Sequence, residues 1–169
     1  MADLSRLQEV GRATYVPYYP HIWKPGGLEW YMEKCFGKEV LQIELNDPNL
    51  VYWLAESDAG ETIGFLKTIA RKSPPPGVIL PEKAFYLEKI YLMPAYFGKG
   101  IGQELLQFAK NKALQAECNA IWLMVMKSGP VKAYEKAGFQ KIGEVYWDFA
   151  PLKEHERGGW AMLCNLEQL

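Results

Sequence analysis

The amino-acid sequence predicts a mixed α/β (α+β) domain, in which about four helices flank a central, mostly antiparallel sheet with one splayed parallel pair. Its 169 residues, 49% of them hydrophobic, are enough for one well-packed core, so a single domain over residues 1–169 is expected. Two strand patterns joined by a short turn between residues 50 and 70 indicate an antiparallel hairpin. From residue 84 a strand, a helix and a strand follow one another, which indicates a right-handed crossover between parallel strands.

Two helices and an aromatic connector precede the hairpin. Ser5 and Gln8 have the spacing of a capping box, so the first helix is expected to begin near Ser5. Apolar side chains recur every three or four residues from Leu28 to Ile43, which predicts a second helix. Between the two, residues 15–30 carry three tyrosines, two tryptophans and three prolines. Such a segment either lines a cavity with its rings or covers an edge of the core.

The remaining elements alternate between strands and helices. The continuous apolar run IWLMVM is typical of a strand that is covered on both faces. A final strand at a sheet edge would allow two copies to pair, so a homodimer is left open. The expected elements are strands over Leu50–Glu56, Glu61–Ala70 and Ala84–Leu92, a helix over Ile101–Ala116, a strand over Ala120–Met126, a short helix over Pro130–Ala137, and strands over Phe139–Asp148 and Trp160–Leu166.

Charge and composition narrow the class of protein. The net charge of −1 argues against a broad basic face for nucleic acid, where phosphate neutralisation supplies most of the affinity. Three cysteines without CxxC spacing and only two histidines indicate buried thiols in a reducing compartment and no metal site. With neither the apolar stretch of a signal peptide nor a run long enough to span a membrane, a cytoplasmic protein without a membrane partner is expected.

A glycine-rich turn between a strand and a helix carries the strongest chemical signal. In the run Gly98–Gly102, glycines alternate with Lys99 and Ile101 immediately before the predicted helix. Glycines let the backbone turn tightly, so several N–H groups and the unpaired donors of the helix converge on one anion. The spacing fits neither the GxGxxG pattern nor a Walker A loop, in which Ser or Thr follows Gly-Lys. We therefore expect a phosphate site built from backbone amides.

Two motifs resemble the GNAT family of N-acetyltransferases, and the resemblance covers nearly the whole chain. The family's phosphate loop has Arg or Gln, two residues, Gly, any residue, then Gly or Ala, which corresponds here to Phe97–Gly102. A second motif, VKAYEKAGF over Val131–Phe139, is similar to the family block that ends in Tyr-x-Lys-x-Gly-Phe. Two motifs in this order are far more specific than either alone.

The resemblance implies acetyl-coenzyme A as co-substrate and transfer of its acetyl group to a primary amine. Strand backbone then pairs with the pantetheine arm, the glycine loop holds the pyrophosphate, and Tyr134 protonates the departing thiolate. The alternative for Tyr134 is simple packing against Val131 and Phe139. The residues implied in coenzyme binding are Ile90, Tyr91, Leu92, Gly98, Lys99, Gly100, Ile101, Gly102, Gln103, Tyr134 and Lys136.

Two departures from the family pattern concern the coenzyme site. Phe97 replaces the usual Arg or Gln, so side-chain help from that position is absent. The loop before Pro130 is about two residues short, and the usual Asn is missing; Ser128 is at best a substitute for its contact with pantetheine.

Glu88 is the carboxylate that we expect to act as general base, directly or through water. With a period of two, its strand face reads Ala84, Tyr86, Glu88, Ile90 and Leu92, so an acid interrupts an apolar row. Burial there would raise its pKa and prepare it to accept a proton from an ammonium substrate. The alternative is a structural ion pair with a lysine.

The acceptor is expected to be a small-molecule amine. Within the family, LEKIYLMPAYFGKGIG and IWLMV look most similar to bacterial spermidine/spermine-type polyamine acetyltransferases. Glu29, Glu33 and Asp58 could help to collect a polyamine, although such acids are more often simply solvated. The alternatives are a protein or peptide N-acetyltransferase and a coenzyme A-binding regulatory module that has lost its chemistry.

Overall fold

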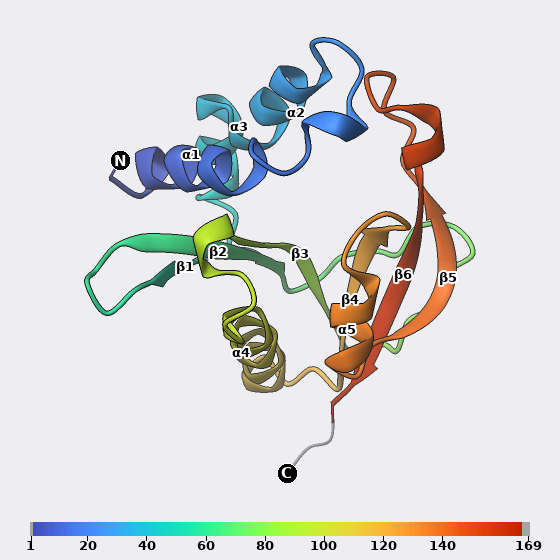
Figure 1. The fold of residues 1–169 in the computed structure, drawn as a ribbon. Helices are drawn as coiled ribbons and strands as arrows, with labels where there is room; N and C mark the ends of the chain where they lie inside the picture. Colours follow the sequence, from blue (N-terminus) through green and yellow to red (C-terminus); the bar gives the residue numbers. More distant parts are fainter. Residues whose placement is uncertain (1, 167–169) are drawn as a thin grey trace.

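The structure is a computed structural model that describes residues 2–166, and Figure 1 shows its ribbon. One six-stranded sheet has the order β1-β2-β3-β4-β6-β5, and its neighbouring strands are antiparallel except for the parallel pair β3 and β4. The predicted fold class is therefore confirmed. The helices and strands are α1 (Ala2–Tyr15), α2 (Gly27–Phe36), α3 (Lys38–Glu44), β1 (Leu50–Glu56), β2 (Thr62–Ile69), β3 (Ala84–Leu92), α4 (Ile101–Gln115), β4 (Ala120–Met126), α5 (Val131–Lys136), β5 (Gln140–Tyr146) and β6 (Gly158–Asn165), with short 3-10 turns η1 (Pro20–Ile22), η2 (Pro94–Tyr96) and η3 (Glu154–Glu156).

Each face of the sheet has its own core. Neighbouring residues of a strand point to opposite faces, and on β2 this separates Phe65 from Leu66. Phe65 packs in a cluster with α1 to α3, including Leu7 and Leu41. Leu66 packs in a second cluster, which includes Ala109 of α4. Figure 1 shows the same division, with α1, α2 and α3 on one side of the sheet and α4 on the other.

The crossover helix α4 buries a narrow stripe against β3 and β4. Its buried residues Leu106, Ala109 and Ala113 recur at steps of three and four, as the helical period requires. Ile121 and Trp122 of β4 are fully buried, because the strand has neighbours on both edges and cover on both faces. The apolar run that lacked alternation in the sequence is thus explained by burial.

Glycine breaks the expected helix from Leu28 to Ile43 into α2 and α3. Gly37 lies between them with φ −56° and ψ 144°, which is extended rather than helical backbone. A β-carbon there would lie 2.5 Å from the carbonyl oxygen of Glu33, so only glycine fits this close approach. The expected start near Ser5 was also wrong, because α1 is already helical at Ala2.

The last strand does not lie at an edge of the sheet. β6 is paired to β4 on one side and to β5 on the other. The expectation that Trp160–Leu166 lies at a sheet edge is therefore wrong, since the hydrogen-bonding groups of that strand are used within the chain. The strands at the edges are β1 and β5.

The described part of the chain gives three further facts about its class. Cys35, Cys118 and Cys164 are free thiols. Between residues 2 and 166, no helix combines the length and the apolar character needed to cross a bilayer. Within the same residues, no three His, Cys, Asp or Glu side chains come together as a metal site would require.

Candidate functional site

The parallel strands β3 and β4 diverge toward their C-terminal ends. They pair only from Ala84↔Ala120 to Tyr86↔Trp122, whereas β3 continues to Leu92. Along Ile90–Leu92, β3 is paired with β2 alone, so its edge toward β4 keeps backbone N–H and C=O groups without a sheet partner. Such groups need partners, and an extended ligand with amide groups can supply them. Ile90, Tyr91 and Leu92 are three of the predicted coenzyme residues.

The turn that follows β3 leads into the N-terminus of α4 and is open to a ligand. Gly98 and Gly100 have φ of +73° and +85°, the left-handed region that favours glycine. A β-carbon at Gly98, Gly100 or Gly102 would meet no atom within 4 Å. No side chain within the described residues caps the first turn of α4, so its amides and the positive end of the helix dipole remain available. The geometry is compatible with a phosphate, and the phosphate site stays a prediction.

The charged and amide side chains around this turn have distinct positions. Lys99 lies over the ring of Tyr96, with its Nζ 5.2 Å from the ring centroid. The Gln103 side chain donates a hydrogen bond of 3.1 Å to the carbonyl oxygen of Ala133, which ties the first turn of α4 to α5. Lys136 is exposed at the end of α5. Gln103 thus links the two predicted family motifs directly.

Tyr134 lies half-buried on α5 and packs edge-to-face against Phe139, with ring centroids 6.0 Å apart. Burial raises its pKa, and the nearby Tyr19 raises it further, so the phenol is protonated at neutral pH. Among the described residues its hydroxyl makes no hydrogen bond. Both expectations for Tyr134 are thus compatible with the geometry, because a packed ring here still keeps its proton available.

Tyrosine rings from the N-terminal segment gather on β3 beside Tyr134. The Tyr15 ring stacks on Tyr19 at 4.5 Å and meets Tyr91 edge-on at 5.6 Å. Tyr31 of α2 lies 4.8 Å from Tyr15. The pKa of Tyr91 is raised well above its ordinary value by burial, with a smaller contribution from Tyr134 among its neighbours. Tyr15, Tyr19, Tyr31 and Tyr91 therefore form one connected cluster, and one of its members, Tyr19, is near enough to raise the pKa of the candidate acid.

Two connectors that are remote in sequence meet beside this cluster. Trp23, which follows η1, forms an isolated antiparallel bridge with Leu152 in the β5–β6 connector. The Lys153 amide donates to the carbonyl oxygen of Ile22 at 3.0 Å. Figure 1 shows the two segments together at the same end of the molecule. No residue of the β5–β6 connector is among the sequence-predicted site residues; its aromatic pair Trp147 and Phe149 was the only signal in that stretch.

Ser128 follows β4 and faces the same connector. Its hydroxyl donates to Glu156 Oε2 at 2.5 Å. The hydroxyl thus joins the loop before α5 to η3, and its proton is used within the chain. A contact from Ser128 to pantetheine would have to use the oxygen as an acceptor.

Glu88 lies at a β-bulge, and this changes its surroundings from those expected. Lys67 pairs with Lys89, whereas Thr68 pairs with Leu87, so Glu88 is the extra residue of β3. The bulge breaks the row with a period of two that was expected from Ala84 to Leu92.

Two lysines neutralise the Glu88 carboxylate. Its Oε2 lies 2.8 Å from Lys67 Nζ and its Oε1 lies 3.1 Å from Lys89 Nζ. Burial by itself raises the pKa of Glu88, but the charges of Lys89 and Lys67 outweigh it and hold that pKa below its usual range. The expectation of a raised pKa was therefore wrong. The ion pair weighed as the alternative is present.

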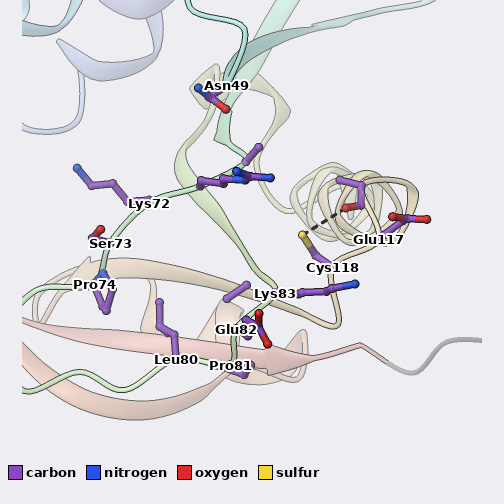
Figure 2. Close-up of a pocket in the computed structure, with 14 residues that line it drawn as sticks. Asn49, Lys72, Ser73, Pro74, Leu80, Pro81, Glu82, Lys83, Glu117 and Cys118 are labelled. Atoms are coloured by element: carbon purple, nitrogen blue, oxygen red, sulfur yellow. Dashed lines mark hydrogen bonds between the residues drawn. The ribbon is translucent and has the colours of Figure 1, made fainter.

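A separate basin lies at the other end of β3, and Figure 2 shows its lining side chains. It is bounded by residues 70–74, by residues 80–84 and by Ala116, Glu117 and Cys118, which follow α4. None of the predicted catalytic or coenzyme residues lines it. The acidic candidates for polyamine capture are also elsewhere: Glu29 pairs with Arg12 at 3.0 Å on the exposed side of α2.

Comparisons with known proteins agree with this geometry. The model of the acetyltransferase (GNAT) family matches residues 12–139, which is more than half of the chain. The chain therefore belongs to the GNAT family. N-acetyltransferase 8 of Rattus norvegicus is 30% identical over 138 residues, and the match covers 76% of this chain and 59% of the rat protein. The match thus spans less than two thirds of that relative's length.

Solved structures share the fold over nearly the whole chain. The PaiA N-acetyltransferase from Thermoplasma acidophilum in complex with coenzyme A has a TM-score of 0.71 and 23% identity, with 97% of this chain and 93% of that chain covered. A chimera of the spermidine N-acetyltransferase SpeG from Vibrio cholerae has a TM-score of 0.67 and 17% identity, with 97% and 91% covered. At these identities the likeness concerns the fold alone.

Proposed function

We propose that this protein transfers the acetyl group of acetyl-coenzyme A to a primary amine of a small molecule, by direct attack of the amine. The observation that carries the proposal is that the open N-terminus of α4 and the protonated phenol of Tyr134 lie on helices joined by the Gln103–Ala133 hydrogen bond. Membership of the GNAT family and a solved neighbour in complex with coenzyme A support it.

The donor side of the site is the stretch from the end of β3 through the glycine turn into α4. Its backbone suits coenzyme A. Acetyl-coenzyme A supplies the acetyl group as a thioester. The uncapped amides of α4 and the open glycine turn would hold the pyrophosphate, with Lys99, Gln103 and Lys136 around it. The edge of Ile90–Leu92 that lacks a sheet partner would bind the amides of the pantetheine arm. This assignment needs no arginine at Phe97, because backbone donors form the anion site.

Tyr134 and Glu88 would move the two protons of the reaction. Glu88 accepts a proton from the substrate ammonium, directly or through water, and its lowered pKa means that it begins as a carboxylate. Tyr134 donates a proton to the departing thiolate, and its raised pKa means that the proton is present at neutral pH. The substrate nitrogen gives up two protons, one to Glu88 before the attack and one after it that restores the phenol of Tyr134, and the thiol leaves protonated.

The tyrosine cluster and the two joined connectors favour a compact acceptor. The Trp23–Leu152 bridge connects the segments on either side of this region and would narrow the path for a peptide chain more than for a small amine. Aromatic faces attract cationic amines and pack against apolar stems. A polyamine is the first candidate to test, since solved neighbours with this fold are named for spermidine.

An assay of free thiol release against polyamines, aminoglycosides, amino acids and peptides tests the proposal. We expect release of coenzyme A with a small amine. We expect Tyr134→Phe to lower kcat by roughly 10²- to 10³-fold, because a general acid contributes in this range, with little change in the Kd of coenzyme A. Tyr146→Phe is a matched control, since this tyrosine is 65% exposed on the edge strand β5.

The outcomes separate the alternatives. Unchanged turnover in Tyr134→Phe would remove Tyr134 from the mechanism. Coenzyme A binding by the wild type without thiol release from any amine would favour a regulatory module instead. Release with peptides alone would favour a peptide N-acetyltransferase.

A further inference from the structure

Four charged side chains form a continuous chain across the face of the sheet under α1 to α3. Glu44 at the end of α3 places Oε1 2.5 Å from Lys67 Nζ of β2. Lys67 Nζ is also 2.8 Å from Glu88 Oε2, and Glu88 Oε1 is 3.1 Å from Lys89 Nζ. The order Glu44–Lys67–Glu88–Lys89 alternates negative and positive charge, so the four formal charges cancel.

The two lysines are the most deeply buried members of the chain. Lys67 is 3% exposed and Lys89 is 8% exposed, whereas the side chains of Glu44 and Glu88 are 21% and 26% exposed. A buried ammonium ion is costly unless it is paired, so these lysines require the carboxylates beside them. The Lys67 ammonium forms ion pairs with two carboxylates, those of Glu44 and Glu88.

Other contacts fix Glu44, which lies at one end of this row of four charges. The Tyr52 hydroxyl of β1 donates to Glu44 Oε2 at 2.5 Å, which leaves Oε1 directed at Lys67. The ammonium of Lys67 also lies 5.6 Å from the centroid of the Tyr52 ring. Tyr52 of β1 thus orients the Glu44 carboxylate toward Lys67 of β2. The position of the Lys67 ammonium therefore depends on both Tyr52 and Glu44.

The bulge makes Glu88 depend on the neighbouring strand. Because Lys67 stands opposite Lys89 and Glu88 is the additional residue, the carboxylate lies between the two ammonium groups. Its orientation and charge are consequently set across the sheet by Lys67 as well as by its own strand.

We propose that Lys67 is a positioning residue for the proton acceptor: it holds the Glu88 carboxylate ionised in one orientation, and Glu44 limits how strongly it does so. This rests on the proposed function, in which Glu88 accepts a proton from the substrate ammonium. In that step one N–H bond breaks, and its proton forms the Glu88 carboxylic acid. The amine keeps the electron pair, and Lys67 and Lys89 keep their protons.

The other groups around Glu88 determine the direction of its titration. Tyr86 of β3 and Tyr52 of β1 are neutral at pH 7, because burial raises the pKa of both phenols and Glu88 adds a smaller contribution to each. Glu44 repels the Glu88 carboxylate, whereas Lys67 and Lys89 attract it. Loss of Lys67 therefore raises the pKa of Glu88, and loss of the Glu44 charge lowers it.

Opposite shifts in two variants test the proposal. In Lys67→Met we expect the acidic limb of the kcat/KM pH profile to move up by about one pH unit or more, because a buried charge at this distance is worth at least one pKa unit. In Glu44→Gln we expect the limb to move down. Lys67→Arg restores the positive charge and should return the limb toward the wild-type position. Lys141→Met is the matched control, since its pair with Glu135 at 3.3 Å is exposed, and no shift is expected.

A second readout does not depend on turnover. In protein with ¹³C-labelled glutamate, the Glu88 carboxyl signal is identified by its loss in Glu88→Gln, and its titration is followed in each variant. The proposal is supported if both the titration and the pH profile move up in Lys67→Met and down in Glu44→Gln. It is overturned if neither of them moves, or if the titration moves and the pH profile does not. If Lys67→Met does not fold, Glu44→Gln and Lys67→Arg decide by the same criteria. If the wild type acetylates no amine, the proposed function fails, whereas the titration still decides whether Lys67 controls the charge of Glu88.

Discussion

The donor side and the acceptor side of the candidate site are built in different ways. The donor side consists of one continuous stretch, from the end of β3 through the glycine turn into α4, and it offers backbone groups. The acceptor side combines α1, α2, the η1 connector, β3 and the β5–β6 connector, and it offers aromatic and charged side chains. Backbone chemistry that depends on local spacing can be found in a sequence, whereas a side-chain cluster drawn from distant segments cannot.

The difference has a consequence for mutations. On the donor side, a substitution matters when it changes the backbone conformation or obstructs its amides. On the acceptor side, a substitution matters when it loosens the packing that brings separate segments together. Binding of coenzyme A and binding of the amine should therefore change independently of one another.

The largest expected effect is on stability, in Leu152→Ala. Leu152 is fully buried in the core under α1 to α3 and bridges to Trp23, so truncation should cost about 2–5 kcal/mol of unfolding free energy. Because it lies on the acceptor side, we expect a higher KM for the amine and an unchanged Kd of coenzyme A. Leu106→Ala, in the α4 core, should cost a similar free energy and weaken coenzyme A instead. If both variants changed the KM for the amine and the Kd of coenzyme A to the same extent, the distinction between the donor side and the acceptor side would be wrong.

The next effect concerns the donor turn, in Gly100→Val. A β-branched residue at φ +85° costs about 1–2 kcal/mol, so the turn should adopt another conformation. We expect the Kd of coenzyme A to rise roughly 10-fold, measured by titration calorimetry. Gly60→Val is the matched control, because Gly60 has φ +77° and equally open surroundings in the β1–β2 turn. In Gly60→Val we expect a similar loss of stability without a change in the Kd of coenzyme A. A changed Kd in this control would contradict the assignment of coenzyme A to the turn at Gly100.

The smallest effect is expected from Phe97→Arg. Phe97 is 42% exposed and meets Tyr18 edge-on at 4.8 Å, so it is the point where the donor turn touches the acceptor connector. An exposed arginine near the pyrophosphate should tighten coenzyme A only a few-fold, by up to about 1 kcal/mol, and this gain should vanish at high salt. Tyr18→Ala separates the lost aromatic contact from the added charge. A gain that persists at high salt would rule out the electrostatic explanation.

The sequence predicted the parts of the site that are governed by local backbone chemistry. Gly98 and Gly100 do adopt left-handed conformations, and α4 does follow them without a side-chain cap. The crossover from β3 to β4 was likewise predictable from element order, since parallel neighbours need a long connection. The catalytic roles of Tyr134 and Glu88 stay predictions, to be decided by the variants above.

Other parts depended on contacts that no local pattern contains. The direction of the Glu88 pKa was mispredicted because two lysines outweigh burial, and one of them stands on another strand. The break at Gly37 was missed because it depends on a close approach to Glu33 one turn earlier. The interior place of β6 depends on strand order, which short-range periodicity does not specify.

By itself, the sequence determined the fold class, the crossover and the glycine turn before α4, because these depend on residues that are neighbours along the chain. Only the tertiary structure decided that β3 and β4 separate after three pairs, that Tyr15, Tyr19 and Tyr91 gather in one cluster, and that Glu88 stands between two buried ammonium groups. The physical reason is that electrostatic energies and packing depend on distances in space, which the folded chain sets between residues far apart in sequence.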